Sequence, residues 1–138
     1  MKSLPRLLPV FVVLTVLVAV AACDKDNPLP LRKDAVRLGS CSTIVFDKSQ
    51  VKICYNKLIS DSRCPAGVVC VWEGVAAGEF TFYEGGNTHK LTLATMKYGP
   101  YSSDIMVGNY RIQLISIDPY PGEKDPRPAG AVVKVTKQ

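Results

Sequence analysis

The 138-residue sequence lacks the motifs by which many enzyme active sites are recognised. It has no GxSxG nucleophile elbow, no HExxH zinc motif and no glycine-rich phosphate loop. Its only histidine, His89, adjoins Lys90 at the start of an alternating polar and apolar segment. Asp61, Glu73 and Glu79 are candidates for a carboxylate pair, but nothing in the sequence brings them to the separation that a glycosidase needs. We therefore predict a protein that is not an enzyme, with no metal and no cofactor.

The sequence also lacks a cluster of basic residues, because lysine and arginine never occur three in a row. The formal net charge is +5, and it falls to +3 if residues 1–22, which carry Lys2 and Arg6 and no acidic residue, are removed. A nucleic-acid surface needs clustered cations that release counterions from the phosphates. Nucleic acid is therefore excluded as an expected partner.

No apolar run is long enough for a permanent membrane helix. The longest extends from Leu7 to Val20 and is interrupted by Pro9 and Thr15, whereas a span needs about 20 apolar residues. Its length and the preceding positive residues are typical of a signal peptide. We assign residues 1–22 to that signal, which would direct the chain out of the cytoplasm.

The end of this signal has a specific pattern. Val20-Ala21-Ala22-Cys23 resembles the lipobox of bacterial lipoproteins, in which small residues precede a cysteine that is lipidated before cleavage. The resemblance implies that Cys23 becomes the lipidated first residue of a membrane-anchored cell-envelope protein, on the periplasmic or the cell-surface side. The alternative is an ordinary secretory signal cut near Ala22.

The rest of the chain divides into a tether and one domain. Residues 23–38 contain Pro28 and Pro30 among charged residues and show no amphipathic period, so they are predicted to form the lipidated N-terminus and a flexible tether. Residues 39–138 are long enough for one domain of ordinary globular composition, since 47% of the whole chain is hydrophobic and 21% is charged.

The domain lacks any sustained helical stripe and instead shows short segments that alternate with period two. Turn sequences lie between several of them, such as the residues 84–87, 98–100 and 119–122. We predict an all-β domain, a small sandwich or barrel of six to eight strands. The strand segments are residues 42–46, 50–55, 77–83, 90–95, 110–117 and 131–136.

Four cysteines remain after Cys23, an even number in an oxidising compartment. Fully extended, Cys64 and Cys70 would lie about 20 Å apart, so a disulfide requires the segment to double back. Cys-Pro-Ala-Gly fits a type I turn with proline second and glycine fourth. We predict a Cys64–Cys70 disulfide and, by elimination, Cys41–Cys54, each contributing roughly 2 to 3 kcal/mol.

Two other uses of these cysteines are weaker alternatives. Structural zinc usually shows paired C-x₂₋₄-C knuckles, and a redox pair usually shows C-x-x-C at the start of a helix. Neither spacing is present. If the segment around Cys70 is extended, Trp72 points to the same face, so we predict a core tryptophan beside the disulfide, with a ligand platform as the alternative.

Three tyrosines are candidates for contact with a partner, either an envelope protein or a small ligand. Tyr98, Tyr101 and Tyr120 lie in turn-rich segments, where tyrosine often contributes to binding, although tyrosines at strand ends also cap cores. The predicted function is a lipid-anchored, non-catalytic envelope protein that binds or serves as a structural accessory. A small envelope hydrolase or a secreted-type inhibitor domain is the alternative.

The stretch DSRCPAGVVCVWEG, residues 61–74, resembles a signature D-S-R-C-P-x-x-V-x-C-x-W-x-G of small exported bacterial proteins. The segment 115–122 is also similar, so the resemblance covers residues 60–122. It implies a shared fold and the Cys64–Cys70 pair, but no activity. Within this stretch we expect Asp61, Ser62 and Arg63 to form a turn network around the disulfide.

Overall fold

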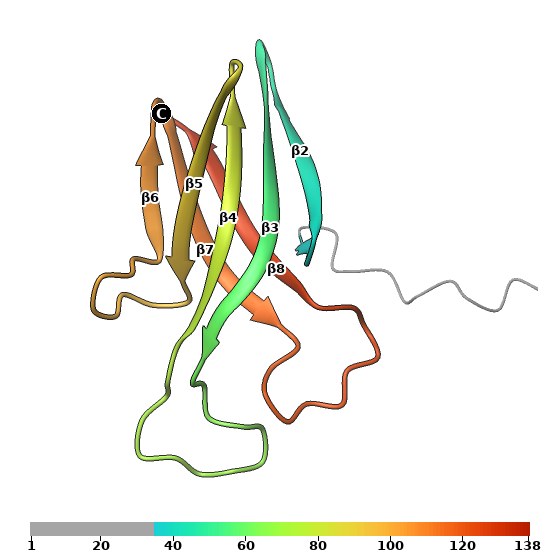
Figure 1. Cartoon of the computed structure of the whole chain (residues 1–138), viewed down its shortest axis with the longest axis vertical. Helices are drawn as coiled ribbons and strands as arrows, with labels where there is room; N and C mark the ends of the chain where they lie inside the picture. Colours follow the sequence, from blue (N-terminus) through green and yellow to red (C-terminus); the bar gives the residue numbers. More distant parts are fainter. Residues whose placement is uncertain (1–34) are drawn as a thin grey trace, which may run out of the picture.

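The computed structural model describes residues 35–138, which form two four-stranded antiparallel sheets (Figure 1). The order is β1-β8-β7-β6 in one sheet and β2-β3-β4-β5 in the other. This sandwich-like arrangement confirms the all-β prediction. The strands are β1 (Ala35–Arg37), β2 (Ser40–Phe46), β3 (Ser49–Asp61), β4 (Ala76–Glu84), β5 (Asn87–Ala94), β6 (Asp104–Val107), β7 (Tyr110–Asp118) and β8 (Gly130–Lys137).

The core lies between the two sheets. Ile53, Tyr55, Phe80 and Phe82 fill it from the sheet that contains β3 and β4, and Ile112, Leu114 and Tyr110 fill it from β7. The rings of Tyr55 and Phe80 stack with their centroids 4.9 Å apart, and Phe82 meets Tyr110 across the sandwich at 5.8 Å. Along β7 these positions alternate with the more exposed Arg111 and Gln113, whereas on β3 and β4 the intervening Cys54 and Thr81 are also buried.

The connections of the sandwich differ between its two ends (Figure 1). Short hairpin turns join β2 to β3, β4 to β5 and β6 to β7 at one end, next to the C-terminus. Gly85 and Gly86 form the turn between β4 and β5 with φ values of 52° and 88°, where glycine is strongly favoured. The longer loops 62–75, 95–103 and 119–129 gather at the opposite end, here called the loop end.

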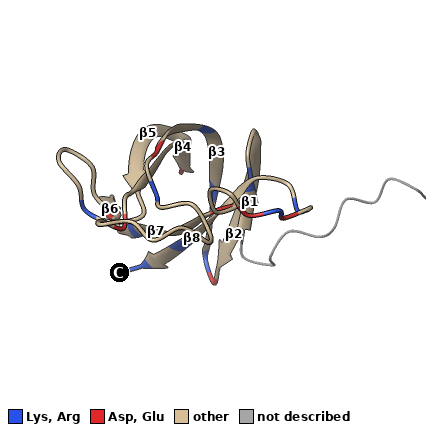
Figure 2. Cartoon of the chain, turned by 90° about the horizontal axis from the view of Figure 1, so that it is seen from below, with Lys and Arg blue, Asp and Glu red and all other residues tan. Residues whose placement is uncertain are grey.

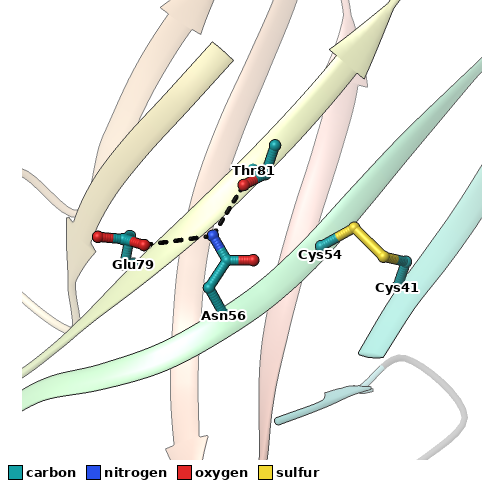
Figure 3. Close-up of a disulfide and its surroundings, with 5 residues drawn as sticks. All are labelled: Cys41, Cys54, Asn56, Glu79 and Thr81. Atoms are coloured by element: carbon teal, nitrogen blue, oxygen red, sulfur yellow. Dashed lines mark hydrogen bonds between the residues drawn. A yellow bond between two sulfur atoms is a disulfide. The ribbon is translucent and has the colours of Figure 1, made fainter. Parts of the chain in front are cut away.

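The Cys41–Cys54 disulfide joins β2 to β3 (Figure 3). The two cysteines face each other in the antiparallel register, with their Cα atoms 3.9 Å apart. Two residues further along β3, Asn56 donates a hydrogen bond of 2.7 Å to the hydroxyl of Thr81 on β4. The disulfide therefore secures the edge strand β2 to the interior of its sheet.

The structure corrects two boundaries predicted from sequence. Residues 35–38, predicted as tether, belong to the sandwich: β1 pairs with the first residues of β8, and Val36 is buried in the core. Three residues are too few to show a period, and the pairing is supplied by a strand almost a hundred residues away. β3 is also longer than predicted and continues to Asp61 through two bulges, which bend the strand toward the loop end.

In the view from the loop end, basic and acidic residues are interspersed, without a broad face of one sign (Figure 2). Within residues 35–138, no helix is long and apolar enough to cross a lipid bilayer.

Candidate functional site

The loop between β3 and β4, residues 62–75, projects from the loop end (Figure 1). It exposes a group of apolar side chains. Val69 is 100% exposed, Val71 95%, Trp72 77% and Val68 59%. We call these four residues the apolar tip and the loop that carries them the tip loop. No charged residue occurs between Cys64 and Trp72. Contiguous exposed apolar residues make this loop the candidate for an interaction surface.

The tip loop has a narrow neck where its two ends pair. Ser62 and Cys64 donate backbone hydrogen bonds to the carbonyl oxygens of Val75 (2.9 Å) and Glu73 (3.1 Å). The Ser62 hydroxyl also accepts from the Val75 amide and donates to its carbonyl, both at 3.1 Å. Gly74 lies directly against this pairing: a Cβ there would be 1.9 Å from the Ser62 carbonyl oxygen, and its φ is 71°. Only glycine fits this position.

Arg63 ties the neck to the body of the sandwich. Only 8% of the residue is exposed, and its guanidinium group donates to the backbone carbonyls of Ile117 (2.6 Å) and Pro119 (3.2 Å). It also binds both carboxylate oxygens of Asp61, at 2.9 and 2.7 Å, and lies 4.5 Å from the ring centroid of Tyr120. A planar guanidinium group with several fixed donors suits such a junction. Arg63 thus joins the end of β3 to the end of β7.

The charges at this junction stabilise one another. Partial burial would raise the pKa of Asp61, but the hydrogen bonds and charge of Arg63 outweigh it, so the pKa of that carboxyl lies below its usual range. Burial raises the pKa of Tyr55, in the adjoining core, to about 12. Asp61 and Tyr55 are therefore ionised and neutral, respectively, at neutral pH.

The Cys64–Cys70 disulfide closes the distal part of the tip loop, with the Cα atoms 5.9 Å apart. The turn inside it begins one residue later than predicted. Val68 donates to the Pro65 carbonyl at 3.2 Å, and Gly67 occupies the third position with a φ of 80°. This is a type II turn, not the predicted type I turn, because the positive φ falls on the glycine.

The prediction that Trp72 belongs to the core is wrong. β3 ends at Asp61 and β4 begins at Ala76, so residues 68–72 have no strand beside them and form no sheet face. Without a sheet, the alternation that would place Trp72 next to Cys70 against a core does not apply. Gly67 and Gly74, which bracket the segment, are the sequence signal that favours a loop here.

A groove of about 560 Å³ adjoins the tip. It is lined by Ser62, Trp72, Glu73, Gly74, Val75, Met96 and Tyr98. Of the three tyrosines considered for partner contact, only Tyr98, 64% exposed, lines this groove. Tyr101 packs against the small cluster of Val75, Ala77 and Ala94, and Tyr120 lies on Arg63. The latter two tyrosines support the loops that surround the groove.

The polar residues considered for catalysis are spread over different surroundings. Glu79 accepts a hydrogen bond from Asn56 at 3.5 Å and forms an ion pair with Lys57 at 3.4 Å. Asp61 is bound by Arg63, whereas Glu73 lines the groove. His89 lies on β5 opposite Phe82 of β4. In the described part of the chain, no three His, Cys, Asp or Glu residues cluster in a way that could hold a metal ion.

All four cysteines of the domain are engaged in disulfides, with the pairing that the sequence predicts. Their sulfurs are therefore not thiolates that could bind zinc. Cys23, the predicted lipidation site, lies outside the described residues. Comparison of the chain with protein-family models, curated proteins and solved structures finds no match.

The role of Gly74 can be separated from that of an ordinary turn glycine. We expect Gly74→Ala to lower the free energy of unfolding by more than about 3 kcal/mol, because the new methyl group overlaps the Ser62 carbonyl and the positive φ adds strain. Gly67→Ala is the matched control: its φ is also positive, but nothing lies within 4 Å of the added Cβ, so we expect a loss of about 1–2 kcal/mol. Urea unfolding measures both, and equal losses would contradict the close contact at the neck.

The Asp61–Arg63 pair predicts a specific pH dependence. Because the folded-state pKa of Asp61 is lowered, its contribution is present above the unfolded pKa of about 4 and is lost as the pH falls through the folded value. We expect Asp61→Asn to cost about 2–3 kcal/mol at pH 7, and less as the pH falls below about 4. Asp104→Asn, which removes an exposed pair with Arg111, should cost at most about 1 kcal/mol. A pH-independent cost for Asp61→Asn would contradict the assignment.

Proposed function

We propose that the protein is a lipid-anchored, non-catalytic binding protein of the cell envelope and that it binds through its apolar tip. The observation that carries this proposal is the near-complete exposure of Val69 and Val71 beside an exposed Trp72 on a loop held in place from both sides. Two disulfides in one small domain are typical of proteins that fold in an oxidising compartment.

The exposed tip supports binding on energetic grounds. Each apolar side chain gains about 1.5–3 kcal/mol when it leaves water, so the tip offers several kcal/mol to a partner that covers it. Arg63, the neck and the Cys64–Cys70 disulfide order the tip loop before any contact forms. Because the loop is already ordered, little of this binding free energy is offset by the entropy lost on ordering it.

The anchor is supported by the sequence around Cys23. The lipobox-like Val20-Ala21-Ala22-Cys23 would leave two or three acyl chains on the first mature residue, which is enough for firm membrane attachment. Residues 24–34 would then link the lipid to β1. Eleven residues reach at most about 35–40 Å, so the domain would stay close to the membrane surface.

An inhibitor of a secreted enzyme is the second candidate. The tip loop projects from the domain and is closed by a disulfide, which is a suitable shape for insertion into the cleft of another protein. In this case the tip would contact a protein and the lipid would serve only to localise it.

The lipidation of Cys23 is tested by the mass of the protein that is recovered from the membrane fraction. We expect the protein extracted from membranes of an exporting bacterium to begin at Cys23 and to carry the added mass of a diacylglyceryl group and an acyl chain. Cys23→Ser, which cannot be lipidated, should not be cut at this site and should keep residues 1–22. A membrane-bound Cys23→Ser protein that is cut at the same place, or a wild-type mass without lipid, would contradict the anchor.

The tip is tested by photo-crosslinking from matched positions. Val71 and Val45 are both exposed valines, 95% and 75%, but Val45 lies on β2 near the hairpin end. With a photoreactive residue at either position in cells, we expect adducts from position 71 and few from position 45. A protein or a lipid adduct at position 71 supports a binding tip, whereas equal, weak labelling at both positions would contradict it.

A further inference from the structure

We infer that the partner of the apolar tip is the lipid bilayer itself, so that the domain meets the membrane at two points, the lipid on Cys23 and the tip. This inference rests on the proposed function, because the tether would hold the domain at the membrane where the tip acts. Insertion of the tip would give the sandwich a defined orientation on that surface and direct its hairpin end away from the lipid.

The composition of the tip fits the boundary between headgroups and hydrocarbon. The nine residues from Cys64 to Trp72 carry no charge, so none has to be desolvated at a high cost when the tip enters lipid. Tryptophan concentrates at membrane interfaces, because its ring is apolar and its N–H can bond to polar headgroups. The neighbouring valines would lie in the acyl region.

Three amides in the first half of the tip loop are hydrogen-bonded within the protein, whereas the amides of Val69, Val71 and Trp72 donate to no backbone carbonyl. Val68 donates to Pro65 within the turn, Cys64 donates to Glu73, and Ala66 donates to Pro121 of the adjoining loop at 2.8 Å. Unpaired backbone groups are costly in hydrocarbon, so these internal bonds lower the cost of shallow insertion.

The tether joins β1 at Ala35, which pairs with Val132, the third residue of β8, in the half of that strand nearer the loop end. β1 pairs with Gly130–Val132, the first residues of β8, directly after the loop 119–129. That loop is hydrogen-bonded to the tip loop through Ala66 and Pro121. The tether is at most about 35–40 Å long, so it would hold the tip at a high local concentration near the bilayer. A weak affinity of the tip for lipid is then sufficient for insertion.

Charge is not expected to drive this contact. The acidic residues of the tip loop and its neighbours nearly balance the basic ones, and the Asp61–Arg63 pair is shielded from solvent. The charged residues from position 61 to 75, 95 to 103 and 118 to 129 are Asp61, Arg63, Glu73, Lys97, Asp118, Glu123, Lys124, Asp125 and Arg127. Insertion should therefore occur on zwitterionic lipid and should depend little on salt, unlike binding by a basic patch.

The chain contains one tryptophan, Trp72, so its fluorescence reports on the tip alone. The test uses the lipidated protein reconstituted into zwitterionic phosphatidylcholine vesicles, with and without bromine on the acyl chains. We expect a blue-shifted emission and at least about twofold quenching by the brominated chains, unchanged between low and high salt. Val71→Asp should abolish both effects, and Val45→Asp, the matched exposed valine, should abolish neither.

A vesicle-bound lipidated protein whose Trp72 emission remains that of an indole in water, without quenching, would overturn the inference. A protein adduct in place of a lipid adduct from position 71 would also overturn it while leaving the binding role of the tip intact. The lipid anchor is tested separately by the mass of the protein that begins at Cys23. With lipid-free protein that begins at residue 24, quenching that rises with vesicle concentration supports tip insertion, and no quenching at any concentration counts against it.

Discussion

The buried guanidinium group of Arg63 is the interaction on which the loop end depends. It binds the carboxylate of Asp61 at the end of β3 and the carbonyls of Ile117 and Pro119 where β7 ends. Two segments far apart in the sequence, residues 61–63 and 117–120, are thereby joined at one group, and Tyr120 covers its face. Because these partners satisfy a charge that is almost fully buried, the group cannot be replaced by a simple apolar side chain without leaving Asp61 unpaired.

The core and the tip loop are held by different kinds of contact. The paired sheets bury their own core around Phe80, Phe82 and Ile112, so the domain does not need the apolar residues of the tip loop for folding. The neck, the Cys64–Cys70 disulfide and Arg63 hold that loop by polar and covalent contacts instead. Val69, Val71 and Trp72 are therefore free to face outward, which is the physical basis for the binding role that we propose.

Sequence reasoning predicted those features that depend on local pattern. Alternation identified the long core strands, and the turn of Gly85 and Gly86 lies where turn residues cluster. Cysteine spacing predicted both disulfides, and Arg63 was expected in a turn network. The predictions fail where contacts with residues distant in the sequence determine the structure. β1 is a strand only because β8 pairs with it. Trp72 is exposed because no strand runs beside residues 68–72. The groove beside Trp72 also needs Tyr98, whose position no local pattern reveals.

Amide hydrogen exchange tests the central claim most directly, because the amide of Cys64 in the neck is bonded to Glu73 and the amide of Ala66 is bonded to Pro121 in the native loop. In the wild type we expect both to be protected. In Arg63→Gln, under conditions where the core amide of Phe82 remains protected, we expect both to exchange at rates close to those of an unstructured chain. Full protection of Cys64 and Ala66 in that variant would show that the loop is held without Arg63 and would contradict the account.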